Sequence, residues 1–268
     1  MLGSTMNALP AFLTAHPDAV LVDVVEAKGS TPREAGAFMV VAADALFGTI
    51  GGGQLEFLAI DHAHELLVGD GRSSSLHVPL GPEIGQCCGG RTGLAFTRLD
   101  APSRQALITR QAKLETAYPD VFLFGAGHVG LALVTALRPL PLRVTLIETR
   151  DLADGTVPEG ITHRRVAMPE AEVATIRPGG AAVILTHDHA LDFLIARHAL
   201  ARPDLAYVGM IGSATKRATF AHWLLREGGD QTMLDKLVLP IGGSTLRDKR
   251  PAVIAALVAA ELLAVLLG

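Results

Sequence analysis

The sequence predicts an α/β protein in which an N-terminal α+β domain is followed by a Rossmann-like domain with a doubly wound parallel sheet. The first observation is length, because 268 residues suit two domains. The second is a regular alternation of apolar strands and helical segments that begins at Val121. The third is a G-x-G-x-x-G motif directly after the first of these strands. We therefore expect domains at 1–100 and 120–268, joined by a linker over 101–119.

Composition narrows the class of protein. Apolar residues make up 49% of the chain, and the formal net charge is -4 at pH 7 without any run of like charges. Nucleic-acid binders usually carry a basic stripe, so we expect no nucleic-acid partner. The two cysteines are adjacent, which does not suit a disulfide scaffold, and the N-terminal residues do not resemble a signal peptide. We expect a cytoplasmic protein.

The elements of the first half follow from apolar periodicity and from turn residues. A Val-rich run predicts a strand, and apolar residues at helical spacing after the Gly51-Gly52-Gly53 run predict a helix. Gly, Ser and Pro mark the intervening loops. The expected elements are a helix over 4–16, a strand over 19–27, a hairpin over 37–50, a helix over 54–69 and strands over 75–80 and 91–99.

The second half shows the alternation of strands and helices that is typical of a parallel sheet. One helix is expected within the polar linker, and further helices are expected between the strands. The apolar C-terminal segment contains Glu261 and is short for a membrane span, so we expect a buried or interface helix there, no membrane partner, and a homodimer. The expected strands are 121–124, 143–148, 181–186, 206–211 and 236–240.

The glycine motif predicts an anion-binding turn. Gly125 allows the tight bend, Gly127 lets the backbone approach a phosphate, and Gly130 lets the helix pack close to the strand. Glu148 ends the next strand, where an acidic side chain can accept hydrogen bonds from ribose hydroxyls. His128 lies inside the turn and either contacts a phosphate or caps the loop. A nucleotide site and a purely structural turn both fit this pattern.

The first half carries a second group of candidate residues. Cys87 and Cys88 precede two glycines, and thiolates suit a soft metal centre or can accept transferred sulfur. Two small buried side chains are the alternative. Arg33 follows Ser30, Thr31 and Pro32, and its guanidinium suits a phosphate or a pterin, unless the loop is only a surface turn.

A third candidate segment follows the strand over 181–186. Thr186, His187, Asp188 and His189 lie at the carboxyl end of a strand, where ligands of open α/β sheets gather. Two His and two Asp, counting Asp192, resemble metal ligands, but Thr and Asp are also good helix caps. We expect a polar lining or a cap here and assign no metal site.

Eight sequence blocks together resemble one family, the xanthine dehydrogenase accessory proteins of the XdhC/CoxI family. They occur in the family's order and cover nearly the whole chain from about residue 20. The blocks are GSTPREAGAFMVV, FGTIGGGQLE, GQCCGG, FGAGHVGLALV, THDHALD, YVGMIGS, LPIGG and DKRPAVIAALVAAEL.

This resemblance implies a role in the assembly of a molybdenum enzyme. Such proteins bind molybdenum cofactor (molybdopterin), protect it, and support exchange of an oxo ligand for the terminal sulfido ligand. A cysteine desulfurase supplies the sulfur, and the loaded cofactor passes to the xanthine dehydrogenase large subunit. Cys88, and less directly Cys87, would touch the metal or hold the transferred sulfur.

Two other functions stay open. An NAD(P)-dependent oxidoreductase agrees with the glycine motif and Glu148, although the sequence contains no Tyr-x-x-x-Lys pair. An interaction scaffold would dock the desulfurase to its client and hold no cofactor. The resemblance favours a cofactor-binding chaperone over both, and leaves a nucleotide at the Rossmann site open as an additional ligand.

Overall fold

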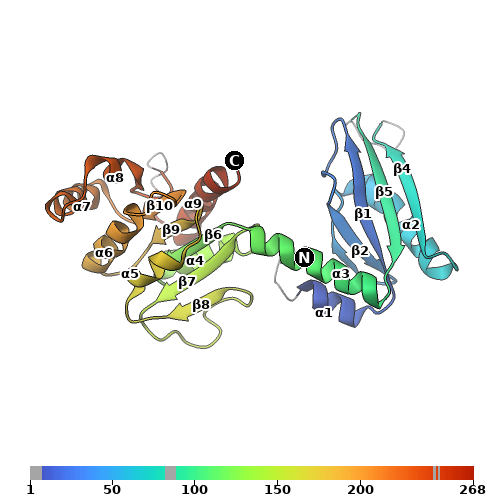
Figure 1. Cartoon of the computed structure of the whole chain (residues 1–268), viewed down its shortest axis with the longest axis horizontal. Coiled ribbons are helices and arrows are strands. Elements are labelled where there is room, and N and C mark those ends of the chain that lie inside the picture. The colour runs from blue at the N-terminus through green and yellow to red at the C-terminus, as the bar shows by residue number, and fades with distance from the viewer. Residues whose placement is uncertain (1–7, 82–88, 244–245, 247) are drawn as a thin grey trace. The chain divides into compact units, whose positions relative to one another are not determined.

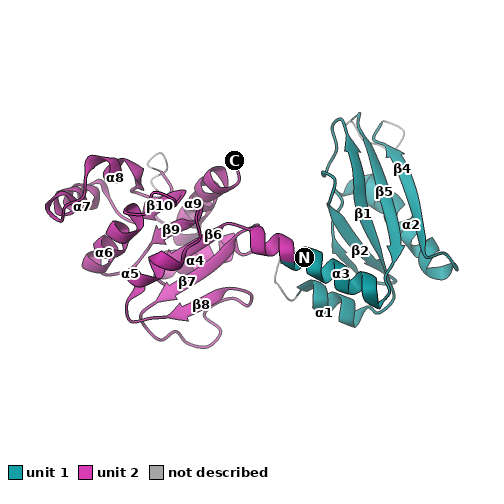
Figure 2. Ribbon diagram, in the orientation of Figure 1, with its two compact units in different colours: residues 1–2, 6–112 teal, residues 3–5, 113–268 magenta. Residues whose placement is uncertain are grey.

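The chain forms two compact units, drawn in teal and magenta in Figure 2. The computed structural model describes residues 8–81, 89–243, 246 and 248–268. The division falls after Ala112, within a single helix, so that unit 1 holds the described residues up to Ala112 and unit 2 holds residues 113–268.

Unit 1 is built on an antiparallel sheet of five strands in the order β3-β2-β1-β5-β4 (Figure 1). Its elements are α1 (Ala8–Ala15), β1 (Ala19–Lys28), β2 (Phe38–Ala42), β3 (Leu46–Gly48), α2 (Gly53–Val68), β4 (Ser73–Pro79), β5 (Arg91–Arg98) and α3 (Ala101–Ala117).

Both faces of this sheet are covered, which explains why β1 has a continuous apolar run. Successive strand side chains point to opposite faces. Val20 and Val22 pack on the side of α2, whereas Ala19 and Leu21 pack on the side of α1 and α3. Each face therefore needs apolar residues, and the strand does not alternate with polar ones.

Helix α3 begins as part of unit 1. Asp100 and Ser103 cap its start, because the Ser103 backbone N–H donates to the Asp100 carboxylate over 2.9 Å. Arg110 Nη2 donates to Asp23 of β1 over 2.6 Å, and its guanidinium lies 4.9 Å from the centroid of the Phe38 ring. The segment expected as a linker is therefore a helix whose first turns pack in unit 1.

Unit 2 contains a parallel sheet of six strands in the order β11-β10-β9-β6-β7-β8. The first strand of the unit, β6, lies beside both β7 and β9, so the strand order reverses between β6 and β9. The elements are β6 (Asp120–Phe124), α4 (His128–Leu137), β7 (Arg143–Glu148), β8 (Thr162–Arg165), α5 (Pro169–Glu172), β9 (Ala181–Ile184), α6 (His189–Leu200), β10 (Tyr207–Met210), α7 (Ala214–Arg226), α8 (Gln231–Lys236), β11 (Leu237–Val238) and α9 (Pro251–Leu266).

Helices cover both faces of this second sheet. Phe122 and Phe124 of β6 pack with Phe220 and other residues from α6, α7 and α8 on one face. Val121 and Leu123 pack with residues of α4 and α9 on the other face. The α/β class and the doubly wound parallel sheet expected from the sequence are confirmed.

Strand β8 and helix α9 add detail that the sequence did not predict for unit 2. Strand β8 was not predicted, because its residues THRR include no apolar side chain and all four lie exposed at the sheet edge. Helix α9 is apolar but packs on α4, and Glu261 within it accepts hydrogen bonds from the Tyr207 hydroxyl (2.8 Å) and from the Gly242 N–H (3.1 Å). Among the described helices, none is long and apolar enough to cross a membrane.

Candidate functional site

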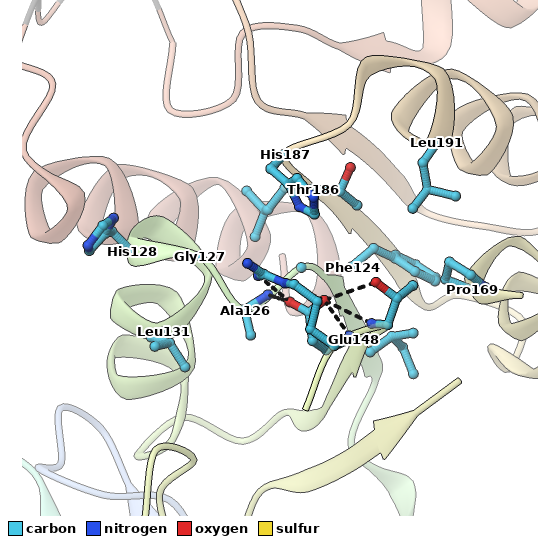
Figure 3. A pocket seen from close by; sticks show the side chains of 15 residues that line it. Phe124, Ala126, Gly127, His128, Leu131, Glu148, Pro169, Thr186, His187 and Leu191 are labelled. Carbon is cyan, nitrogen blue, oxygen red and sulfur yellow. Dashed lines mark hydrogen bonds and ion pairs between the residues drawn. The ribbon is translucent and has the colours of Figure 1, made fainter. Parts of the chain in front are cut away.

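A pocket of about 410 Å³ opens at the carboxyl ends of β6, β7 and β9, at the point where the strand order reverses (Figure 3). Ligands of open α/β sheets bind at this position. Thr186 and His187 lie on the opposite side of the pocket from Glu148. The lining includes Phe124, Gly125, Ala126, Gly127, His128, Leu131, Glu148, Arg150, Leu185, Thr186 and His187.

Each of the three positions of the motif is occupied by glycine for a different structural reason. Gly125 has a φ of 119°, and a Cβ atom there would lie 2.7 Å from the carbonyl oxygen of Leu185. A Cβ on Gly130 would lie 2.0 Å from the carbonyl oxygen of Gly125. Gly127 has an ordinary φ of -72°, and a Cβ there would meet nothing within 4 Å. Packing therefore requires Gly125 and Gly130, whereas Gly127 keeps open the space in front of helix α4.

The start of α4 faces this open space. Gly127 is the N-cap residue and offers no side chain to the first N–H groups of the helix. Unpaired N–H groups and the helix dipole favour an anion at this point. His128 is the first residue of α4, is exposed, and lies at the outer end of the pocket (Figure 3).

Glu148 lies at the end of β7 and holds the glycine turn in place. Its side chain is 4% exposed, and Oε2 accepts a hydrogen bond from the Ala126 N–H over 2.9 Å. Oε1 accepts from the backbone N–H groups of Thr149 (2.8 Å) and Arg150 (3.1 Å). Burial acts to raise the pKa of Glu148, but the hydrogen bonds from Arg150, Ala126 and Thr149 outweigh it and lower the pKa to about 2.

Arg150 completes this arrangement from two residues along the chain. Its Nε donates to Glu148 Oε1 over 3.1 Å, and its Nη2 donates to Oε2 over 2.8 Å. The Arg150 side chain is 52% exposed and lines the pocket. The pocket therefore presents guanidinium donors beside Glu148, which the sequence predicts to accept hydrogen bonds from ribose hydroxyls.

The segment after β9 forms caps and a buried ion pair. Asp188 is the N-cap of α6 and accepts from the Ala190 N–H over 2.8 Å. Asp192 is fully buried, pairs with Lys216, and accepts from the Thr186 hydroxyl over 2.6 Å. No group of three or more His, Cys, Asp or Glu side chains in the described part of the chain is arranged to hold a metal ion.

Unit 1 brings together three glycine-rich segments that are far apart in the sequence. A Cβ atom on Gly29 would lie 3.2 Å from the Cα of Gly90, and Ser30 forms an isolated bridge with Gly89. A Cβ on Gly51 would lie 2.3 Å from the Cβ of Pro32. The loop at 29–33 therefore contacts both the run before α2 and the glycines that follow the adjacent cysteines. We call residues 29–33, 51–53 and 89–90 the glycine-loop cluster.

Open space and positive charge border this cluster. A Cβ atom on Gly52 or on Gly89 would meet nothing within 4 Å. Lys28 and Arg91 flank the cluster and are partners in the register of β1 and β5. Both pair with Glu26, and the hydrogen bond from Lys28 lowers the pKa of that carboxyl group.

The sequence candidates in unit 1 have different outcomes. Arg33 is exposed within the cluster. Cys87 and Cys88 lie outside the described residues, so their roles stay predictions. Lys28 and Arg91 were missed, and so was Arg150 in unit 2. Their positions in the sequence could have identified them. Lys28 and Arg91 each lie next to a glycine of the cluster, and Arg150 lies two residues after the acidic end of a strand.

The fold and the pocket together define a protein with one Rossmann-type unit and an additional antiparallel α+β unit. Residues 12–78 match the family model described as the XdhC and CoxI family, and residues 121–262 match that of the XdhC Rossmann domain. The chain therefore belongs to the XdhC and CoxI family. The resemblance seen in the sequence blocks is thereby confirmed.

One curated relative and one solved structure are similar to this chain. The uncharacterized protein YqeB of Escherichia coli K12 is 26% identical over 256 residues, which cover 91% of this chain but 43% of YqeB. A crystal structure described as a xanthine dehydrogenase from Bacillus halodurans aligns with a TM-score of 0.79 and 18% identity, over 97% of this chain and 95% of that one. At this identity the similarity shows the fold alone.

Proposed function

We propose that this chain is an accessory protein of a molybdenum enzyme. It binds molybdenum cofactor, supports sulfuration of that cofactor, and delivers it to xanthine dehydrogenase. Family membership across both units supports this role, because one matched range, 12–78, lies in unit 1 and the other, 121–262, lies in unit 2. A cysteine desulfurase and the xanthine dehydrogenase large subunit are the proposed partners, and a homodimer is the proposed assembly.

The glycine-loop cluster is the observation that carries this proposal. Three segments with small residues converge there, and no side chain fills the open space beside Gly52 and Gly89. Lys28, Arg33 and Arg91 supply positive charge around it. Molybdopterin carries a phosphate and a planar pterin, and both fit amide donors and guanidinium groups.

The proposed roles of the cysteines rest on their chemistry. A thiolate is a soft ligand that suits a molybdenum–sulfur centre and accepts transferred sulfur. Cys88 and Cys87 precede Gly89 of the cluster in the sequence. We propose that they contact the metal or hold sulfur, while Arg33 binds the phosphate or the pterin.

The pocket of unit 2 is proposed to bind a nucleotide. Gly125 and Gly130 shape the turn, Gly127 leaves room for a phosphate, and His128 stands at the start of α4. Glu148 fixes the turn from the neighbouring strand. A nucleotide here would accompany the molybdenum cofactor, which the proposal places in unit 1.

Cofactor retention tests the proposed function. The purified chain is incubated with molybdenum cofactor and desalted, and the retained pterin is oxidised and quantified by fluorescence. We expect near-stoichiometric retention by the wild type, reduced retention by Arg33→Ala, Cys87→Ala and Cys88→Ala, and unchanged retention by Arg72→Ala. Arg72 is a suitable control because it is 86% exposed in the same unit and lies outside the cluster.

Three results would reject parts of this assignment. A wild-type chain that holds no pterin above background would contradict the carrier function and favour the scaffold. Full retention and normal sulfuration in both cysteine variants would remove the cysteines from the site. Steady turnover of NADH or NADPH with a small-molecule acceptor would instead favour the oxidoreductase.

A further inference from the structure

The Glu148 carboxylate has no free acceptor for a ribose. In dinucleotide-binding folds, an acidic residue at this strand end accepts hydrogen bonds from the ribose hydroxyls. Here its two oxygens accept from the N–H groups of Ala126, Thr149 and Arg150 and from Nε and Nη2 of the Arg150 side chain. A carboxylate has about four acceptor positions, so these five donors occupy them all.

Burial adds to this restriction. The Glu148 side chain is 4% exposed, and Arg150 lies on its solvent side with 52% exposure. A ribose hydroxyl would reach Glu148 only by displacing a bidentate, charge-assisted interaction. A nucleotide with a free 2′-hydroxyl therefore gains little from the residue that would ordinarily select it.

Arg150 instead offers unused donors to the pocket. Its guanidinium has five N–H groups, and Nε and Nη2 each use one on Glu148. The other donors belong to a planar, permanently charged group that matches phosphate oxygens. An Arg close to the acidic position is the feature that accommodates a ribose 2′-phosphate in this fold.

We propose that the pocket of unit 2 selects a nucleotide with a phosphate on the ribose 2′-oxygen over one with a free 2′-hydroxyl. This inference rests on the proposed nucleotide site. The expected ligand is a 2′-phosphorylated adenine nucleotide, and NADP⁺ is the complete dinucleotide of this class. Arg150 binds the 2′-phosphate, and the turn before α4 faces the chain phosphates.

Neighbouring charges at this end of the pocket are balanced in pairs. Arg165 of β8 is the register partner of Glu148 and pairs with Asp151, which is 77% exposed. Arg164 on the same strand pairs with Glu172. Asp151 would repel a phosphate, but its exposure weakens that repulsion through solvent screening.

Paired ligands measure the preference directly. Titration calorimetry on the full chain compares NADP⁺ with NAD⁺. A second comparison, of 2′,5′-ADP with 5′-AMP, uses ligands that lack the nicotinamide. We expect the 2′-phosphorylated member of each pair to bind about tenfold tighter or more. The difference should narrow at high salt, because it depends on a partly exposed charge.

Variants at Arg150 test whether this residue causes the preference for a 2′-phosphate. Arg150→Ala should abolish the preference, and Arg150→Lys should keep a reduced one, because Lys retains the charge but not the planar fork. Arg164→Ala is the matched control: it removes the same charge from an exposed residue that does not line the pocket, and it should leave the preference intact. Trp223 fluorescence verifies that each variant folds.

The possible outcomes separate the two proposals. Equal binding of NAD⁺ and NADP⁺, or tighter binding of NAD⁺, would overturn the 2′-phosphate inference and leave the nucleotide site in place. A preference that persists in Arg150→Ala would overturn the assignment to Arg150. Failure of the wild type to bind any of the four ligands would overturn both the inference and the nucleotide site.

Discussion

The carboxylate of Glu148 accepts a hydrogen bond from the backbone N–H of Ala126, which lies 22 residues earlier in the chain, over 2.9 Å. This bond joins the end of β7 to the turn that follows β6. Because Gly125 and Gly127 flank Ala126, the acidic residue controls the geometry of the glycine turn. Glu148 therefore contributes to the stability of unit 2, and this contribution can be measured by substitution.

Replacing Glu148 by Gln should destabilise unit 2. The amide loses the ion pair with Arg150, and its NH₂ group faces donors instead of acceptors. We expect the free energy of unfolding to fall by about 2–3 kcal/mol. Urea unfolding followed by fluorescence measures this, because the single tryptophan, Trp223, packs against Phe193 and Phe220 in unit 2. Glu159→Gln, at an exposed position, should change the free energy by less than about 0.5 kcal/mol.

The same residue should make stability depend on pH. The pKa of Glu148 is lowered from 4.5 to about 2 in the folded chain, so the stabilisation is complete above pH 4.5 and is lost as the pH falls toward 2. Wild type and Glu148→Gln should therefore differ by a constant amount at neutral pH. Between pH 6 and pH 3 the difference should narrow by about 2 kcal/mol. A difference that stays constant down to pH 3 would show that the carboxylate is not held in its charged form.

Substitutions at Gly127 and Gly130 should separate binding from folding. A methyl group on Gly130 would lie 2.0 Å from the Gly125 carbonyl oxygen, so Gly130→Ala should cost about 3 kcal/mol or more. A methyl group on Gly127 meets no atom within 4 Å, so Gly127→Ala should change stability by less than about 1 kcal/mol. It should still weaken nucleotide binding about tenfold, because the methyl group occupies the space left for a phosphate. Wild-type affinity in Gly127→Ala would place the ligand away from this turn.

Strand and turn positions could be predicted because they depend on local pattern. The strand over 121–124 is apolar throughout, and Val144, Leu146 and Ile147 are the apolar residues of the strand over 143–148, because both faces of the parallel sheet are buried. The glycine motif falls between strand and helix as such turns require. Strand β8 escaped prediction because its residues carry no apolar signal, and only its pairing with β7 defines it.

The chemistry of the two candidate sites depends on contacts that a local sequence pattern does not predict. The position of Glu148 was predictable, but its saturation by Arg150 depends on side-chain conformation at the sheet edge. The convergence of Gly29, Gly51 and Gly90 depends on strand register and on a helix start, and each is separated from the next by more than one element. The sequence therefore indicated the components of both sites but not their arrangement.

The buried pair of Asp192 and Lys216 provides a test of how the pocket edge is held. Asp192 is fully buried, and Lys216 Nζ donates both to its carboxylate and to the Ile211 carbonyl oxygen (2.9 Å). Thr186, which lines the pocket, donates to the same carboxylate through its hydroxyl over 2.6 Å and its N–H over 3.1 Å. The pair thus connects the carboxyl ends of β9 and β10.

Removing both charges of this pair should cost less than the sum of the two single removals. Lys216→Met leaves a buried carboxylate without its cation, and we expect a loss of about 3–5 kcal/mol in urea unfolding monitored at Trp223. Asp192→Asn leaves a nearly buried ammonium with one carbonyl partner and should also be strongly destabilising. The double variant buries no unpaired charge, so its loss should be smaller than the sum of the single losses by about 2 kcal/mol or more. Additive losses would mean that the two charges act independently, and would contradict the coupling of β9 and β10 through this pair.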